Sequence, residues 1–340
     1  MQDRIIKFSK GISFISSASA VGKCEWEGPI GDCFDMHDKS DRFGMKTWEK
    51  AESEMQRLSL NMAMSKVGMS ERDIDLMFAG DLLNQCVGSS YGLLDFDIPY
   101  FGLYGACSTA VEGIMLSAMM VSAGYFERCA AVTSSHNSSA ERQYRTPIEY
   151  GGQRPPTAQW TVTGSGAFLI GRGEGVSICE ALPGIVVDKG VNDANNMGAA
   201  MAPAAVSTLT RYFKISKKSV SDFDLILTGD LGFEGGSVFC ELMEISGYKI
   251  DKKYNDCGMI IYDRNRQDMH SGGSGCGCSA VVLASYILPK IERGELSDVI
   301  VMGTGAMMSP ASIQQGQSIP AIAHLIRLRA GDCQDESEDN

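Results

Sequence analysis

Cys107 is the side chain in this sequence best placed for covalent or close ligand chemistry. It follows Gly105 and Ala106 and stands just ahead of an apolar segment, 109–123, with the composition of a buried helix. The free N–H groups and the positive dipole at a helix start stabilise a thiolate, so this position predicts an activated cysteine. The alternative is that Cys107 is only a small buried residue, one of eleven cysteines.

Two of the four histidines are candidates to lie beside Cys107. His136 follows a short strand expected over 130–133, and open α/β sheets bind ligands at the ends of their strands. His270 lies in a glycine-rich loop ahead of a second apolar segment. A local alternative exists for His136, because Asn137 and the neighbouring serines could hold its ring within the turn.

The segment 141–160 is rich in arginine and aromatic side chains. Arginine forks bind paired carboxylates, and aromatic faces stack on planar rings, so this segment could contact a ligand. The same composition is typical of a dimer contact or a lid loop, and we favour that interpretation slightly. The residues concerned are Arg142, Tyr144, Arg145, Gln153, Arg154, Gln159 and Trp160.

An internal repeat indicates how the chain positions these side chains. DIDLMFAGDLL at 73–83 and DFDLILTGDLG at 222–232 share six identities at an offset of 149. GACSTA at 105–110 matches GCGCSA at 275–280 at an offset of 170, which pairs Cys107 with Gly277. Two matches in the same order indicate a duplicated chain whose halves differ at the nucleophile position.

Both copies show the same alternation of helices and strands. It predicts an α/β protein with two mostly parallel sheets and buried helices between them. Thr109 and Glu112 have the spacing of a capping box. Expected helices are 50–67, 109–123, 200–213 and 280–293, and expected strands are 76–79, 130–133, 167–170, 225–228, 299–302 and 322–328. The expected units are a first half, 1–173, a second half, 174–330, and an acidic flexible tail, 331–340.

Composition excludes several classes of function. Thirty Lys and Arg against 42 Asp and Glu give a net charge of −12, which repels nucleic acid and an anionic membrane surface. Residues 1–10 lack the apolar core of a signal peptide, and no apolar run reaches the about 20 residues of a bilayer span. We therefore expect a cytoplasmic protein with free thiols. No CxxC pair occurs, so no metal site is expected.

A duplicated α/β chain with Gly-Ala-Cys-Ser-Thr at a buried helix start resembles the thiolase superfamily, nearest the ketoacyl synthase III branch. DFDIPYFGLYGACSTA (95–110), SSHNSS (134–139), TGSGA (163–167) and GGSGCGCSA (272–280) more narrowly resemble the stage V sporulation protein AD family. The resemblance covers about residues 1–330. It implies a thiolase-like, five-layered αβαβα sandwich, a homodimer paired through about 130–160, and binding of dipicolinic acid during its loading into spores.

The resemblance also implies roles for single residues. Cys107 matches the nucleophile of the superfamily, the stretch from His270 to Gly273 is the nearest match to its second polar catalytic position, and Gly305 matches a glycine turn that closes the pocket. With His136 and Asn137, these residues form the expected ligand site.

The general-base histidine of a synthase is missing. It should follow the strand that ends near residue 227, where this chain has Thr228-Gly229-Asp230. Losing one of two oxyanion donors commonly costs about 10² to 10³ in rate. The chain is therefore expected to hold a ligand rather than to catalyse condensation.

Three functions remain open. The first is binding of dipicolinic acid, or of its calcium chelate, at the spore inner membrane through membrane-embedded proteins of the same operon. The second is a ketoacyl synthase III-like acyltransferase, which needs only the Cys107 thiolate and an oxyanion hole. The third is a scaffold subunit with an empty pocket. Dipicolinate is a dianion, so a chain of charge −12 predicts that calcium tightens binding, and no other cofactor is expected.

Overall fold

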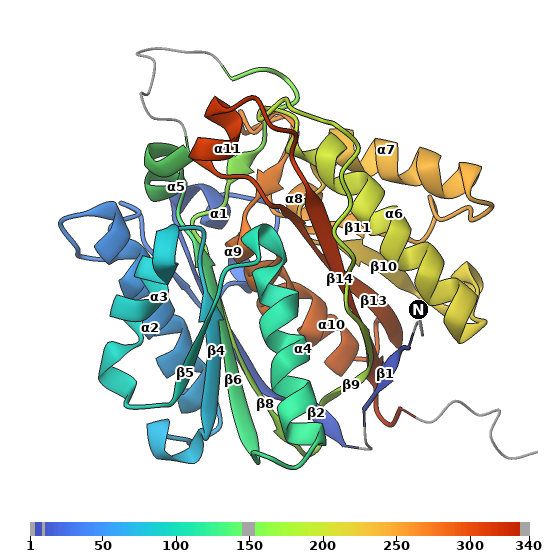
Figure 1. Ribbon diagram of the computed structural model, residues 1–340. Coiled ribbons are helices and arrows are strands. Elements are labelled where there is room, and N and C mark those ends of the chain that lie inside the picture. The colour runs from blue at the N-terminus through green and yellow to red at the C-terminus, as the bar shows by residue number, and fades with distance from the viewer. Residues whose placement is uncertain (1–3, 9–10, 145–153, 334–340) are drawn as a thin grey trace, which may run out of the picture.

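The first copy of the repeat forms a five-stranded sheet in the order β5-β4-β6-β8-β2 (Figure 1). Strands β4, β5 and β6 run parallel, and β8 and β2 are antiparallel to their neighbours. This structure is a computed structural model, and it describes residues 4–8, 11–144 and 154–333. The strands are β2 (Ile12–Val21), β4 (Leu76–Gly80), β5 (Tyr100–Leu103), β6 (Arg128–Ser135) and β8 (Gly164–Arg172).

The second copy repeats that order as β11-β10-β13-β14-β9, with the same directions. We expected two separate sheets, but β2 and β9 are antiparallel neighbours where Ser13 pairs with Ser177, so the sheets are continuous. Gly175 makes this approach possible: its φ is +143°, and a Cβ there would lie 2.5 Å from the Phe14 carbonyl oxygen. The strands are β9 (Val176–Leu182), β10 (Leu225–Thr228), β11 (Tyr254–Asp256), β13 (Asp298–Ala306) and β14 (Ala321–Ala330).

Helices cover both sheets and fill the space between them, which gives the five expected layers. Figure 1 shows α2 and α3 on one outer side, α4 and α10 in the middle, and α6 and α7 on the other. The helices are α1 (Lys23–Trp26), α2 (Trp48–Lys66), α3 (Val87–Gly92), α4 (Thr109–Ser122), α5 (Asn137–Tyr144), α6 (Met197–Ser216), α7 (Gly232–Ile245), α8 (Cys257–Ile260), α9 (Cys276–Val282), α10 (Leu288–Glu292) and α11 (Pro310–Gln314). A π-helical turn, Leu283–Ile287, joins α9 to α10, so the helix expected over 280–293 is continuous but irregular.

Strand residues alternate between the central and outer cores. Phe78 of β4 joins the central core with α4 and α9, whereas Met77 joins the outer core with α2. In β13, Val301 faces the central core and Ile300 packs with α6. Successive strand side chains point to opposite faces, so a sheet covered on both sides is apolar at nearly every position.

Short strands complete the architecture. Strand β1 pairs with β9, β3 pairs with β2, and β7 and β12 form a separate two-stranded sheet. Their bounds are β1 (Ile6–Lys7), β3 (Met36–His37), β7 (Trp160–Thr161) and β12 (Gly273–Ser274). The expected half boundary, between residues 173 and 174, lies in the turn from β8 to β9.

The duplication extends to single hydrogen bonds. Asp73 caps a short helical turn by bonding Ser70, and Asp222 bonds Ser219 in the same way 149 residues later. Likewise, Asp75 Oδ2 accepts the N–H groups of residues 127 and 128, and Asp224 Oδ2 accepts those of residues 297 and 298. These matched anchors support the duplicated origin of the two halves.

Several local expectations are wrong. The capping box at the start of α4 is absent: Thr109 Oγ1 accepts from Gly105 N–H and donates to Ala106 O, while Glu112 Oε2 is buried without a hydrogen bond from the described residues. The part of the expected dimer contact that lies in β6 is internal, because β6 is buried between β4 and β8.

No helix in the described ranges has the length and apolar character needed to cross a bilayer.

Free thiols throughout the chain were also expected, and one pair contradicts this. Cys179 of β9 and Cys333, which follows β14, form a disulfide, with their Cα atoms 5.2 Å apart. The other nine cysteines are free. The expected flexible tail, 331–340, is therefore tied down at residue 333, and residues 334–340 lie outside the described residues.

Candidate functional site

Cys107 lies at the junction of the two halves, in a 3₁₀ turn, Ala106–Ser108, that leads into α4. Ala106 has a positive φ of 52°, an unusual conformation for alanine that turns the chain sharply between β5 and α4. Gly305 of β13 packs on this turn, since a Cβ there would lie 2.8 Å from the Gly105 carbonyl oxygen. The Cys107 side chain is 7% exposed.

The partners of Cys107 come from the second half. Its Sγ lies 4.0 Å from Ser274 Oγ, and the Ser274 hydroxyl donates to Asp230 Oδ2 at 3.0 Å. Thr304 donates to Asp230 Oδ1 at 2.7 Å, and the Gly275 N–H donates to Oδ2 at 3.0 Å. Asp230 follows β10, at the position where the resemblance to synthases leads one to expect a histidine. Its side chain is fully buried.

This environment holds the thiol protonated. Burial raises the pKa of Cys107 well above its usual value, and the nearby Asp230 carboxylate raises it further. Burial also raises the pKa of Asp230. This direction is opposite to the one expected from the helix start, because the loss of solvation and the adjacent acid both raise the pKa of Cys107. The arrangement suits a hydrogen-bonding thiol rather than a nucleophile.

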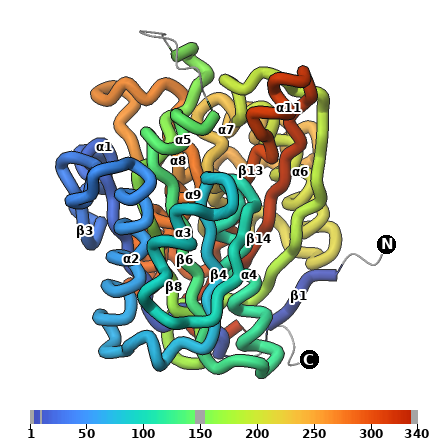
Figure 2. The backbone as a smooth tube through the Cα atoms, turned by 60° about the vertical axis from the view of Figure 1, so that its left-hand side comes forward, coloured from blue at the N-terminus to red at the C-terminus, as the bar shows by residue number. Residues whose placement is uncertain are grey.

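A cavity of about 250 Å³ opens over Cys107. This is slightly below the range of about 300 to 1,000 Å³ usual for drug-sized ligands, so it fits a small molecule. Both halves contribute to the lining, which is Leu82, Ala106, Cys107, Ala140, Glu141, Tyr144, Thr161, Ala194, Asn195, Met197, Ser274, Ala306 and Met308. In Figures 1 and 2, α5 of the first half and α11 of the second lie at the same end of the molecule.

The walls of the cavity are mostly apolar, with thiol, hydroxyl and amide groups from Cys107, Thr161, Ser274 and Asn195. Among the described lining residues, Glu141 is the only one with a charged side chain. Aromatic Tyr144 donates its hydroxyl to the Leu82 carbonyl at 2.7 Å and so closes α5 onto the loop after β4.

The structure does not bring the two candidate histidines to this cavity. His136 Nε2 lies 2.9 Å from the Asp41 carbonyl oxygen, and Nδ1 accepts the Ser138 N–H. Burial lowers the pKa of His136, which keeps the ring neutral. His270 Nδ1 lies 2.8 Å from the Pro155 carbonyl oxygen and Nε2 lies 2.9 Å from Asp268. The alternative proposed for His136 holds for one nitrogen, since Ser138 bonds Nδ1 within the turn, whereas Nε2 contacts a carbonyl distant in sequence.

The other expected contacts lie near the cavity without lining it. Gly273 precedes Ser274 in β12, and the N–H of Asn137 donates to Thr163. Of the arginine-rich segment, Tyr144 lines the cavity, Arg142 pairs with Glu49, and the Arg154 guanidinium lies over Trp160. Arg145 and Gln153 lie outside the described residues.

Sequence reasoning missed Asp230 as a partner of Cys107. A signal existed, because Gly-Asp-Leu follows the matched strand in both copies, at Asp81 and at Asp230. An acid repeated at the end of a buried strand is a candidate site residue. Asn195, Met197 and Met308 carry no comparable pattern.

Comparison with known proteins places this geometry in context. A family model described as stage V sporulation protein AD matches residues 2–329. Stage V sporulation protein AD of Bacillus subtilis (strain 168) is 44% identical over 321 residues, covering 94% of this chain and 95% of the relative.

Solved structures show the same fold at low identity. The 3-oxoacyl-[acyl-carrier-protein] synthase III of Aquifex aeolicus VF5 superposes with a TM-score of 0.58 at 10% identity, covering 94% of this chain and all of that one. A single-residue variant of OleA from Xanthomonas campestris gives a TM-score of 0.58 at 12% identity, covering 94% of this chain and 99% of that one. These similarities confirm the thiolase-like fold expected from the repeat and its motifs.

Proposed function

The chain belongs to the stage V sporulation protein AD family, and from that premise we propose that it binds dipicolinic acid in the cavity over Cys107. The observation that carries the proposal is the pairing of Cys107 with Ser274 and Asp230. A protonated thiol beside a buried acid offers hydrogen bonds but no general base. A small cavity bordered by these groups is suited to binding a ligand by hydrogen bonds, and not to catalysing its conversion.

The lining suits a flat, polar-edged molecule. The Asn195 amide, the Thr161 hydroxyl and the Cys107 thiol are donors for carboxylate oxygens, and the Met197 and Met308 side chains offer adaptable apolar contact for a ring. These groups come from both halves, so the ligand would lie between them.

Charge favours the calcium chelate as the bound form. The described lining contains no cationic side chain, while Glu141 lines the cavity and Asp230 is buried behind Ser274. Among the described lining residues a dianion would meet an acidic side chain and no basic one, whereas a one-to-one calcium chelate is formally neutral. Calcium therefore enters with the ligand and needs no separate protein site.

Calorimetric titration with dipicolinate, with and without calcium, tests the proposal. We expect one ligand per chain, and Ala306→Phe, which fills the cavity, should abolish binding. Ala311→Phe, on the exposed side of α11, is the matched control and should bind as the unmodified protein does. No heat of binding in either condition, or normal binding by Ala306→Phe, would contradict the proposal.

Acyl transfer onto Cys107 is the second candidate, favoured by the place of this thiol at the start of α4. The thiolate is the attacking species, so the raised pKa of Cys107 makes acylation slow. Incubation with an acyl-CoA followed by intact mass measurement tests this directly. A stable acyl adduct that Cys107→Ala abolishes would favour this candidate over binding.

We propose that the protein is a homodimer, paired through β5 rather than through the region around residue 130. Strand β5 is the outer strand of the first sheet, and it carries exposed aromatic side chains: Phe101 within the strand is 58% exposed and Tyr104 just after it is 50% exposed. An uncovered apolar edge strand is a pairing surface. Phe101→Lys should give a monomer in light scattering, and a dimer that persists would contradict this interface.

Contact with membrane-embedded proteins of the same operon, which would place the protein at the spore inner membrane, is part of the same proposal. The net charge of −12 favours attachment through protein partners over anionic lipid.

A further inference from the structure

Two buried carboxyl groups, Glu52 of α2 and Asp81 after β4, lie behind the first-half wall of the cavity. Both are fully buried. They flank Gly88 of α3, where a Cβ would lie 3.1 Å from Asp81 Oδ2 and 3.2 Å from Glu52 Cγ. Two adjacent ionised carboxylates without a cation are strongly unfavourable, so such a pair holds a proton.

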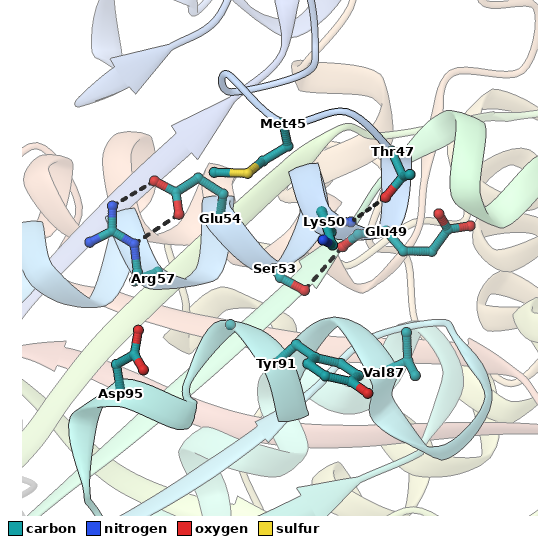
Figure 3. Close-up of a pocket in the computed structure, with 11 residues that line it drawn as sticks. Met45, Thr47, Glu49, Lys50, Ser53, Glu54, Arg57, Val87, Tyr91 and Asp95 are labelled. Carbon is teal, nitrogen blue, oxygen red and sulfur yellow. Dashed lines mark hydrogen bonds and ion pairs between the residues drawn. The ribbon is translucent and has the colours of Figure 1, made fainter.

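Another face of α2 lines a groove and carries charged side chains that are partly exposed. Figure 3 shows Glu49, Lys50 and Glu54 along a groove between α2 and α3, with Glu54 paired to Arg57. Glu54 is two residues from Glu52 on the same helix, but it pairs with Arg57 and is only partly buried. It provides a matched control for the buried acid.

The hydrogen-bond partners identify which acid holds the proton. Asp81 accepts backbone N–H groups on both oxygens, from Leu83 at 2.8 Å and Ser89 at 2.8 Å. A backbone N–H can only donate, so both oxygens must stay acceptors. Glu52 instead meets two hydroxyls, Ser134 on Oε1 at 3.0 Å and Ser139 on Oε2 at 2.7 Å, and a hydroxyl can accept as well as donate.

Hydrogen counting at Ser139 supports the same choice. Its hydroxyl has one hydrogen but two acceptors in reach, Glu52 Oε2 and the His136 carbonyl oxygen at 3.1 Å. When Glu52 is protonated it donates to Ser139, and Ser139 donates to His136, so both contacts are hydrogen bonds. When Glu52 ionises, one hydrogen must be shared between the two acceptors, which weakens at least one contact in the first turn of α5.

From this geometry we infer that a proton on Glu52 regulates the cavity by holding α5 and the loop after β4 in their binding positions. Ser139 adjoins Ala140, and Asp81 adjoins Leu82, and both of these neighbours line the cavity. Loss of the proton places a second negative charge beside Asp81 and weakens the Ser139 contact. Both walls then move, and the ligand is bound less tightly. This inference rests on the proposed function.

The groups that face Glu52 contain no cation among the described residues. Gln56 of α2 bonds Ser89 and Ser134, Gly88 and Ser89 come from α3, and Cys276 of α9 bonds the Ser134 carbonyl oxygen. The nearest histidine ring, His136, is turned to Asp41 and Trp48. Burial, followed by repulsion from Asp81, raises the pKa of Glu52 to about 8, and burial raises the pKa of Asp81.

The experiment follows calcium dipicolinate affinity by calorimetry from pH 6.5 to 9. We expect an affinity that is nearly constant up to pH 7.5 and then falls by about tenfold per pH unit above the pKa, the limit for one linked proton. Glu52→Gln replaces the acid with an amide whose NH2 can donate to Ser139 while its oxygen accepts from Ser134, and it should flatten the profile. Glu54→Gln should keep the fall.

A second measurement needs no variant. Binding at pH 8.5, measured in buffers of different ionisation enthalpy, should show uptake of a proton by the complex. Proton-neutral binding, or a Glu52→Gln profile that falls like that of the unmodified protein, would overturn the inference. If the unmodified protein binds no ligand at any pH, the proposed function fails. The proton on Glu52 is still tested by whether Glu52→Gln reduces the fall in denaturation midpoint between pH 4.5 and 8, since the part due to Asp256 should remain.

Discussion

The two halves share their strand order and several hydrogen bonds, yet they use the same strand-end acid differently. In the first half Asp81 faces Glu52 across α3, away from the ligand cavity. In the second half Asp230, its counterpart, supports Ser274 and raises the pKa of Cys107. The duplicated scaffold therefore supplies a buried acid twice. The residues around each acid differ, so Asp81 lies behind the cavity wall and Asp230 lies beneath Ser274 and Cys107.

The nucleophile position differs for a steric reason. Cys107 has a cavity in front of it, but a Cβ on its counterpart Gly277 would lie 2.4 Å from the Gly164 carbonyl oxygen. Strand β8 of the first half occupies that space. Only one half can therefore carry a side chain at this turn, and the site is single although the fold is double.

The largest expected effect, on protein stability, comes from placing the same residue at the nucleophile position of both halves. Gly277→Cys pushes a side chain into the β8 backbone and should destabilise the protein by about 3 kcal/mol or more, at the upper end of overpacking costs. Cys107→Gly should cost less, because that side chain borders a cavity. Urea denaturation of the two variants checks the order, and equal midpoints would contradict the steric account.

The next effect tests the acid behind Cys107. Asp230→Asn removes the negative charge, so the pKa of Cys107 should fall and its alkylation by iodoacetamide at pH 8 should accelerate, about tenfold for each pKa unit. Asparagine can keep the Gly275 and Ser274 bonds on Oδ1 while its amide donates to Thr304. Peptide mapping must show the added label on Cys107, and an unchanged rate would mean that burial alone protects the thiol.

Stability should depend on pH with a definite sign. The folded-state pKa of Glu52 is about 8, against 4.5 in the unfolded chain, so the folded state binds the extra proton. Stability is therefore full below pH 4.5 and falls as pH rises towards 8. Asp256 of the second half, with its pKa raised by burial to about 7, adds to the fall below pH 7. Midpoints that rise across this range would contradict both assignments.

Calcium and the two histidines give the smaller effects. Calcium should increase dipicolinate affinity, because it neutralises the ligand before it meets Glu141. The sequence predicts that His136 and His270, one from each half, belong to the ligand site, and His136→Ala and His270→Ala test this. Since neither ring lines the cavity, both should now leave the affinity within about twofold of the unmodified value, a difference of about 0.4 kcal/mol. A tenfold loss of affinity in either titration would show that the histidine replaced contacts the ligand after all.

Sequence predicted the fold better than the site, and the reasons are physical. Strand and helix alternation follows from apolar runs, and the repeat doubles the signal. The continuous sheet depends on a single pairing, Ser13 with Ser177, which leaves no trace in the sequence. Both histidines bond backbone carbonyls, of Asp41 and Pro155, and such acceptors exist at every residue. The pairing of Cys179 with Cys333 joins residues 154 apart and has no local signature.

The disulfide between Cys179 and Cys333 can report whether the last strand of the sheet has docked. Cys333 follows the last strand, β14, which lies between β13 and β9 in the sheet. Cys179 of β9 is synthesised about halfway along the chain, whereas Cys333 comes only after β14. The bond can therefore close only once the second copy has been synthesised and β14 has docked beside β9. The number of free thiols counted in the denatured chain, eleven before closure and nine after it, therefore reports whether the last step of folding has taken place. A protein arrested before that step would be distinguishable from a mature one by thiol counting alone.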